Sequence, residues 1–222
     1  MLDKKFTIDH DTVWQRPDQA YFDYKEASKG IDPERLEWDG KFKHLREKKD
    51  IAVFGVCIYA LMGRPTFVQM NSKSDSPDAF LLQPSERNQA TANLAPVEIT
   101  FYGRNKLGLP KESLADRLAK AGGKFQAKLP PGYWLLVHIG IGMTPDHLEV
   151  TRRLTEMNAQ FSVFSIQEVS NYPDTIARFV RYNPQCETAD INIGEVAARL
   201  AKSDIPGTLM QVKGFPPKEI AK

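Results

Sequence analysis

Residues 65–102 contain three short segments, PTFVQM (65–70), DAFLLQ (78–83) and PVEITFY (96–102), each with the length and composition of a β-strand. Turn-forming and polar residues separate them, so we expect three consecutive strands joined by short connections. Side chains alternate along a strand, which gives the third segment an apolar face and a second face that carries Glu98 and Thr100. This run of three strands decides the fold class.

The segments on either side complete an alternating pattern of helices and strands. Apolar residues at helical spacing predict a helix from His44 to Leu61, and YWLLVHIG (133–140) is apolar on both faces, as a covered central strand is. The other expected elements are helices at 112–121, 144–157 and 193–201 and strands at 161–169 and 175–182. The order predicts an α/β fold with a mixed central sheet flanked by helices on both faces.

The sequence divides into three parts by composition. Residues 1–40 form an acidic N-terminal extension with ten acids and six bases, residues 41–183 the α/β core, and residues 184–222 a C-terminal tail with one short helix. Aromatic residues are scattered through the extension, and the tail is polar. We expect both parts to suit docking of a protein partner or a second copy of the chain. Among the extension's aromatic residues are Trp14, Tyr21, Phe22, Tyr24 and Trp38.

Composition excludes several classes of protein. The chain has 222 residues, of which 41% are hydrophobic and 26% charged, as in ordinary globular proteins. No apolar run approaches the ~18–20 residues that cross a bilayer, and no signal-peptide pattern is present at the start. Two cysteines cannot make a disulfide framework. We therefore expect a cytoplasmic protein without a membrane segment.

Basic residues cluster in two places although the net charge is only +2. Residues 41–49 hold five bases and one acid, and residues 104–128 hold seven bases and two acids. Such clusters bind phosphate groups, and they also occur on solvated helix faces; charge alone does not separate the two interpretations. The candidate nucleic-acid contacts are Lys111, Arg117, Lys120 and Lys124.

Two acidic residues on successive strands form a candidate metal site. Asp78 opens the second strand after Pro77, and Glu98 lies on the polar face of the third. If the strands are neighbours, both carboxylates meet at one end of the sheet, where oxygen ligands suit Mg²⁺ or Mn²⁺. Glu47, in the first turns of the preceding helix, is a third candidate. Taken singly, an Asp after Pro is often a turn former and a strand Glu is often solvated.

This organisation resembles the PD-(D/E)xK nuclease superfamily, which has the restriction-endonuclease-like fold. The resemblance covers residues 41–182 and rests on the order of elements, on Pro77-Asp78 and on Val97-Glu98-Ile99-Thr100. It implies a metal-dependent DNA endonuclease in which Asp78 and Glu98 bind the metal and Glu47 matches the helix glutamate of many members. The sequence departs from the family at Thr100, where a catalytic lysine is expected. Substitutes for that lysine are Arg104, Lys106 and Arg117.

Two other functional hypotheses remain open at the level of sequence. The missing lysine is compatible with a catalytically silent nuclease fold that binds DNA or a protein partner within a larger complex. The turn Gly140-Ile141-Gly142 between a strand and a helix resembles a dinucleotide-binding turn, but it lacks the third glycine. His138, in an apolar strand, has the setting of a core histidine whose hydrogen bonds are made inside the protein.

Overall fold

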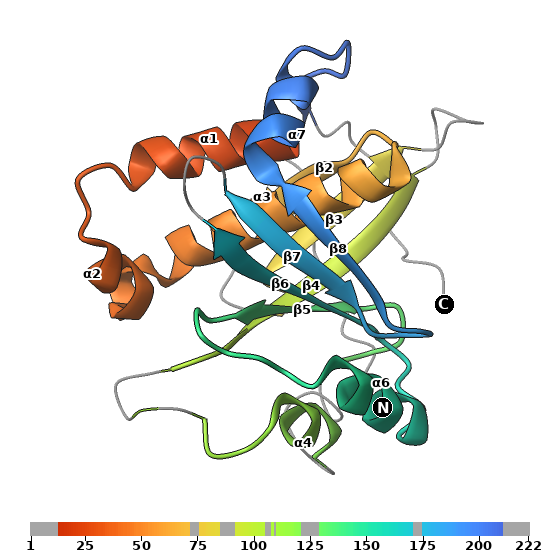
Figure 1. Cartoon of the computed structure of the whole chain (residues 1–222). Helices are drawn as coiled ribbons and strands as arrows, with labels where there is room; N and C mark the ends of the chain where they lie inside the picture. The colour runs from red at the N-terminus through yellow and green to blue at the C-terminus, as the bar shows by residue number, and fades with distance from the viewer. Residues whose placement is uncertain are drawn as a thin grey trace.

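A mixed β-sheet forms the centre of the computed structural model, which describes residues 13–71, 76–84, 92–104, 108, 110–120, 129–170 and 175–210. The nine strands in these ranges follow the order β8-β7-β6-β5-β4-β3-β2-β1-β9 across the sheet. Helices cover both faces (Figure 1). The predicted fold class, α/β with a mixed sheet flanked by helices, is therefore confirmed.

The strand directions divide the sheet into a parallel centre and antiparallel sides. β4 pairs in parallel with β5, and β5 with β6, whereas the other neighbours are antiparallel. The strands are β1 (Val13–Gln15), β2 (Phe67–Met70), β3 (Ala79–Pro84), β4 (Ala92–Tyr102), β5 (Trp134–Ile139), β6 (Ser162–Ser170), β7 (Ile176–Arg181), β8 (Glu187–Asn192) and β9 (Thr208–Met210).

Each face of the sheet has its own group of helices. Figure 1 shows α1, α3 and α7 on one side and α4 and α6 on the other. A short helix α2 and a 3₁₀ turn lead into α3. The bounds are α1 (Pro17–Ala27), α2 (Pro33–Trp38), the turn (Gly40–Phe42), α3 (Lys43–Met62), α4 (Leu114–Ala119), α6 (His147–Glu156) and α7 (Ile193–Ala201).

The main core lies between α3 and the sheet. Residues 51–58 of α3 are buried on every side, as the sequence pattern predicted. At its centre, the Phe54 ring is fully buried and packs 5.2 Å from the ring of Phe164 and 6.0 Å from that of Phe179. A second cluster fills the space between the opposite face and helices α4 and α6. These apolar contacts fix α3 across the sheet.

Three strands were not anticipated from the sequence. β1, β8 and β9 come from the segments predicted as extension and tail, and β1 lies between β2 and β9. β1 and β9 have three residues each, so neither gives a periodic pattern of its own. The helix expected from Thr144 instead begins at His147, because the Asp146 carboxylate accepts the Glu149 amide as its N-cap.

The N-terminal aromatic residues serve the chain's own core. Trp14, Tyr21 and Tyr24 are buried, Trp14 beside Phe67 and Tyr21 and Tyr24 in the cluster under α3. The proposal that these aromatic residues dock a partner is therefore wrong for these three, because their surfaces are already covered. Phe22 is 44% exposed. In the described ranges, no helix combines the length and the apolar composition that crossing a membrane requires.

Gly55 gives a direct test of how tightly α3 is packed. A Cβ atom at this position would lie 2.7 Å from Cγ of Pro17 and 2.9 Å from Cγ1 of Val68. Gly55→Ala should lower the free energy of unfolding by about 1–3 kcal/mol through overpacking, although alanine is the better helix former. Chemical denaturation measures this. Gly40→Ala, where a Cβ meets open space, is the matched control, and equal stability of the two variants would contradict the packing.

Candidate functional site

A notch in the sheet brings the predicted acidic residues together. β3 pairs with β4 only from Pro84↔Ala92 to Ala79↔Val97, whereas β4 continues to Tyr102. Along residues 98–102, β4 is paired with β5 on one side and has passed the start of β3 on the other. We call this place, beside residues 98–102 of β4 where β3 begins, the notch. In this register Asp78, just before Ala79, is opposite Glu98.

Asp78 completes the hydrogen bonding of β4 at the notch. Its Oδ2 atom accepts a hydrogen bond of 2.8 Å from the backbone amide of Ile99. A buried backbone donor needs an acceptor, and here the carboxylate replaces the carbonyl that a longer β3 would supply. The chain before β3 is held by Asn71, whose side-chain amide donates to the carbonyl of Pro77 at 2.7 Å. The Asp78 side chain is therefore fixed in the notch.

Glu98 is buried rather than solvated. Its exposed fraction is 8%, and its negative charge acts on the neighbouring Tyr133. Burial raises the pKa of Tyr133, the Ser76 hydrogen bond lowers it and Glu98 raises it, with a net value of about 12. Thr100 is half-buried on the same face of β4, two residues further on. The predicted face of Glu98 and Thr100 therefore lines the notch.

The first turns of α3 bring a cation and a third carboxylate close to these acids. Lys43 Nζ lies 2.9 Å from Oε1 of Glu47, whose side chain is 13% exposed. The hydrogen bond to Glu47 raises the pKa of Lys43, and attraction to the charges of Asp78 and Glu98 adds to it. Burial raises the pKa of Glu47, the Lys43 hydrogen bond opposes this, and repulsion from Asp78 raises it further.

Lys43 is the functional candidate that sequence reasoning missed. It acts on three carboxylates, whereas the substitutes expected for the missing lysine were Arg104, Lys106 and Arg117. Arg104 is exposed just after β4, Arg117 lies on α4, and Lys106 falls outside the described residues. The available signal was the spacing of Lys43 and Glu47, which places them together on one helix face.

The predicted nucleic-acid contacts are arranged differently from the expected basic helix. Lys111 precedes α4, Arg117 lies within it, Lys120 is its C-cap, and Lys124 falls outside the described residues. Within the described part of the chain, Arg104, Lys111, Arg117 and Lys120 make no ion pair. Their charges are therefore available to an external anion.

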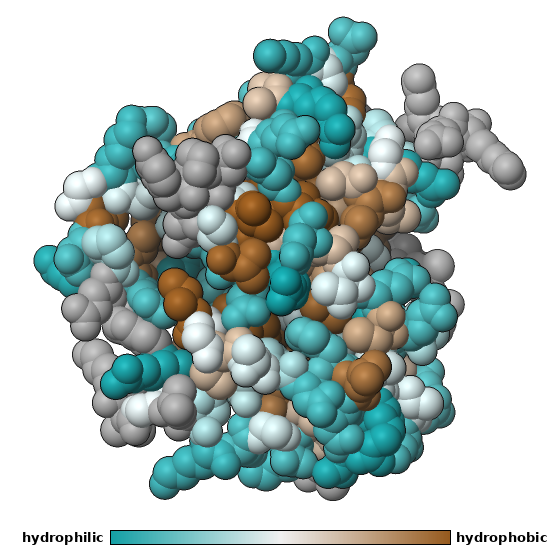
Figure 2. Space-filling model, viewed as in Figure 1, coloured by the Kyte–Doolittle hydropathy of each residue, from teal (hydrophilic) through white to brown (hydrophobic). Residues whose placement is uncertain are grey.

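The basic cluster at 41–49 is, by contrast, used inside the protein. Lys41 lies near Asp39, Lys48 pairs with Asp23 and Lys49 with Glu168, while the Arg46 guanidinium donates to backbone carbonyls. On α6 the two arginines are bonded to Glu149, Glu156 and Asp116. Figure 2 shows hydrophilic surface over most of the region around α4 and α6, with smaller apolar patches.

The notch residues fit a magnesium ion with few protein ligands. Mg²⁺ usually keeps several waters and is held by one or two carboxylates. Asp78 uses Oδ2 for the Ile99 amide, which leaves Oδ1 for a cation opposite Glu98. Among the described residues, no three His, Cys, Asp or Glu side chains are close enough to one another to hold a metal.

A second polar cluster lies one turn further along α3. His138 Nδ1 and Asp50 Oδ1 are 2.6 Å apart, with 23% and 8% of their side chains exposed. Burial lowers the pKa of His138, but attraction to Asp50 and their hydrogen bond outweigh it, so the pKa lies above its ordinary value. Lys49, the preceding residue of α3, forms an ion pair with Glu168 on the next strand, β6. These contacts join α3 to β5 and β6.

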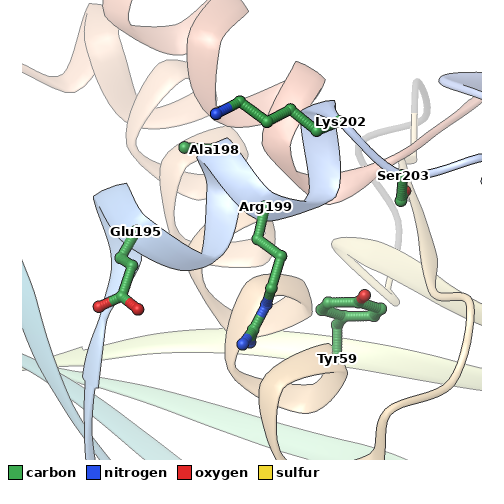
Figure 3. Close-up of a pocket in the computed structure, with 6 residues that line it drawn as sticks. All are labelled: Tyr59, Glu195, Ala198, Arg199, Lys202 and Ser203. Atoms are coloured by element: carbon green, nitrogen blue, oxygen red, sulfur yellow. The ribbon is translucent and has the colours of Figure 1, made fainter.

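A surface hollow of about 580 Å³ lies elsewhere, between the end of α3 and α7 (Figure 3). Its lining includes Tyr59, Glu195 and Arg199. Tyr59 is twelve residues beyond Glu47 on α3, which is about 18 Å along a helix. Arg199 and Lys202 stand at the end of α7, where cations complement the helix dipole. The hollow is therefore separate from the predicted acidic residues. We place the candidate site at the notch, where those residues lie.

No protein-family model, curated protein or solved structure matches the chain.

Substitution of Asp78 separates its structural from its electrostatic role. Asp78→Ala should lower the free energy of unfolding by about 1–3 kcal/mol, because the Ile99 amide loses its acceptor. Asp78→Asn should lose less, since its amide oxygen still accepts. Denaturant titration measures both variants, with Asp204→Ala, at an exposed residue, as the control. Equal losses for Ala and Asn would show that the hydrogen bond contributes nothing.

Proposed function

We propose that the chain is a metal-dependent nuclease of the PD-(D/E)xK type that hydrolyses phosphodiester bonds in DNA. The observation that carries the proposal is the Asp78 carboxylate, which its hydrogen bond to the Ile99 amide holds opposite Glu98, with the charge of Lys43 acting on both acids. One buried and one half-buried carboxylate, with a lysine whose charge acts on both, are groups that metal-assisted phosphoryl chemistry uses. The cofactor would be Mg²⁺ or Mn²⁺ at Asp78 and Glu98.

The arrangement of the elements also supports this proposal. Helix α3 is followed by three antiparallel strands, β2, β3 and β4, and then by α4 and the parallel strand β5. The sequence resemblance rested on this order. Of the two candidate ligands, Asp78 immediately precedes β3 and Glu98 lies within β4.

Each residue around the notch would have its own role in the proposed reaction. Asp78 and Glu98 would hold the cation, which supplies a Lewis acid and orients the attacking water. Lys43 would place an ammonium beside the scissile phosphate, where a fixed positive charge stabilises the transition state. Glu47 holds Lys43 by its hydrogen bond. Thr100 provides a hydroxyl group beside Glu98 but no charge, so Lys43 takes over the role of the expected lysine.

The cations after β4 support DNA as the substrate. Arg104, Lys111, Arg117 and Lys120 follow directly from the strand that carries Glu98, and none is neutralised by a described acid. Phosphate contacts by such side chains provide most of the affinity for DNA and carry no sequence information. The same cations also support a second function, a nuclease fold that binds DNA without cleaving it, which Thr100 at the lysine position favours.

A cleavage assay tests the catalytic proposal. Wild type should cut DNA with Mg²⁺ or Mn²⁺, and Glu98→Gln should abolish cutting because a metal ligand loses its charge. Lys43→Met should lower kcat about 10²–10³-fold, the usual cost of removing one transition-state donor. Lys41→Met is the matched control, since Lys41 is an exposed cation near Asp39 and precedes Lys43 by two residues.

The outcomes separate the two functions. Full activity of Glu98→Gln would remove the notch from the mechanism. If wild type cuts no single-stranded, duplex or branched DNA with either metal but still binds DNA, the silent binding function replaces the enzyme.

The salt dependence of binding tests the DNA surface. Each phosphate contact contributes about 0.9 to the slope of log K against log salt concentration on duplex DNA. Neutralising Arg104, Lys111, Arg117 and Lys120 to Gln should therefore reduce that slope by about 2–4, as measured by fluorescence anisotropy. Arg152→Gln with Arg153→Gln is the control, because both arginines are bonded to α6 acids. An unchanged slope in the fourfold variant would show a surface that meets only solvent.

A further inference from the structure

The first half of α3 presents a row of charged residues to the sheet. Lys43, Glu47 and Asp50 are four and three residues apart and therefore lie along one side of the helix. The charges of Asp78 and Glu98 act on Lys43, that of Asp78 acts on Glu47, and Asp50 contacts His138 on β5. The same row thus joins the candidate site to a half-buried histidine.

His138 stands at the carboxyl end of β5, opposite Phe101 of β4. The rings of His138 and Phe101 are 5.4 Å apart. The charged groups that act on His138 are Asp50 and Lys49 from α3 and Glu168 from β6. Asp50 is the one in direct contact, at 2.6 Å.

The two halves of α3 are attached to the sheet by different forces. Apolar side chains hold residues 51–58, whereas the turns before them are attached by Leu45, which packs against the core, and by polar contacts. Of these contacts, Lys48–Asp23 reaches α1 near the surface, and Lys49–Glu168 and Asp50–His138 reach the sheet. Asp50 is more deeply buried than His138, Lys49 or Glu168, and it is about one turn from Glu47. The Asp50–His138 contact therefore attaches these turns to the sheet at a deeply buried polar residue.

We propose that the Asp50–His138 pair is a positioning device that holds the Lys43–Glu47 turn of α3 against the notch, and that it holds this turn most firmly when His138 is protonated. The positioning role is inferred from the part-buried hydrogen bond between Asp50 and His138. Its effect on catalysis rests on the proposed function. His138 is a positioning residue, because it acts on the site through α3.

The direction of the pH dependence follows from the ion pair. The pKa of His138 lies above its ordinary value of 6.5, since the attraction to Asp50 outweighs burial. The stabilisation is therefore complete below about pH 6.5 and is lost as the pH rises through the raised pKa of the folded state. Above that pH, neutral His138 still donates a hydrogen bond to Asp50, but the charge attraction is gone.

Hydrogen exchange measures the position of the turn without any metal or substrate. In wild type, the protection factors of the amides at 43–50 should fall at least threefold between pH 6 and pH 8, relative to those of α7. His138→Asn should abolish this pH dependence, because the Asn amide group, at the place of Nδ1, donates to Asp50 at every pH. His138→Phe, which keeps a ring beside Phe101, should show low protection throughout.

Lys48→Met is the matched control, because it removes the contact of the same turns with α1 and should leave the pH dependence as in wild type. A wild-type pH dependence retained in His138→Asn would overturn the proposal. So would wild-type protection in His138→Phe. The Asn variant keeps the hydrogen bond, so the test stands even if the Phe variant fails to fold.

Cleavage with Mn²⁺ connects the device to catalysis. His138→Phe should lower kcat at least tenfold at pH 6, and His138→Asn should restore most of it, while Lys48→Met stays near wild type. Absence of cleavage in wild type with the expected exchange pattern would overturn the nuclease function but not the positioning. Normal cleavage by His138→Phe would overturn the link between the pair and the site.

Discussion

The site depends on the unequal extent of two neighbouring strands. β4 continues five residues beyond its last pairing with β3, and the amide of Ile99 must find an acceptor there. A backbone amide left without one in the interior is costly, so a side-chain oxygen at the residue before β3 satisfies a structural need. Asp78 supplies that oxygen, and the carboxylate which completes the sheet also brings a negative charge opposite Glu98.

This constraint also explains why the charges gather on α3. Two acids at a sheet edge, one of them buried, require a cation nearby, because burying a carboxylate without compensation is unfavourable. The charge of Lys43 acts on both acids, while its largely exposed side chain is hydrogen-bonded to Glu47. The apolar second half of α3 fixes the helix over the sheet, so its first turns reach the notch. Packing in the apolar half of α3 therefore determines where the charged residues of its first half lie.

The sequence predicted the elements that have a periodic pattern of their own, but not the contacts between distant segments. The three strands at 65–102, the helix around Phe54 and the alternation that puts Glu98 and Thr100 on one face all follow from periodicity. The pairing of β1 with β9 does not, since it joins the two ends of the described chain through three-residue strands. The contact of Asp50 with His138 spans 88 residues in sequence, and no spacing rule reaches that far.

The same distinction explains why the sequence around Thr100 did not point to Lys43. A sequence motif specifies the residue type at position 100. Catalysis instead depends on where a positive charge lies relative to the phosphate. Lys43 is more than 50 residues before Thr100, yet it acts on Asp78 and Glu98. The cations after β4, which sequence reasoning considered as substitutes, are better suited to contact the phosphates on either side of the reacting one.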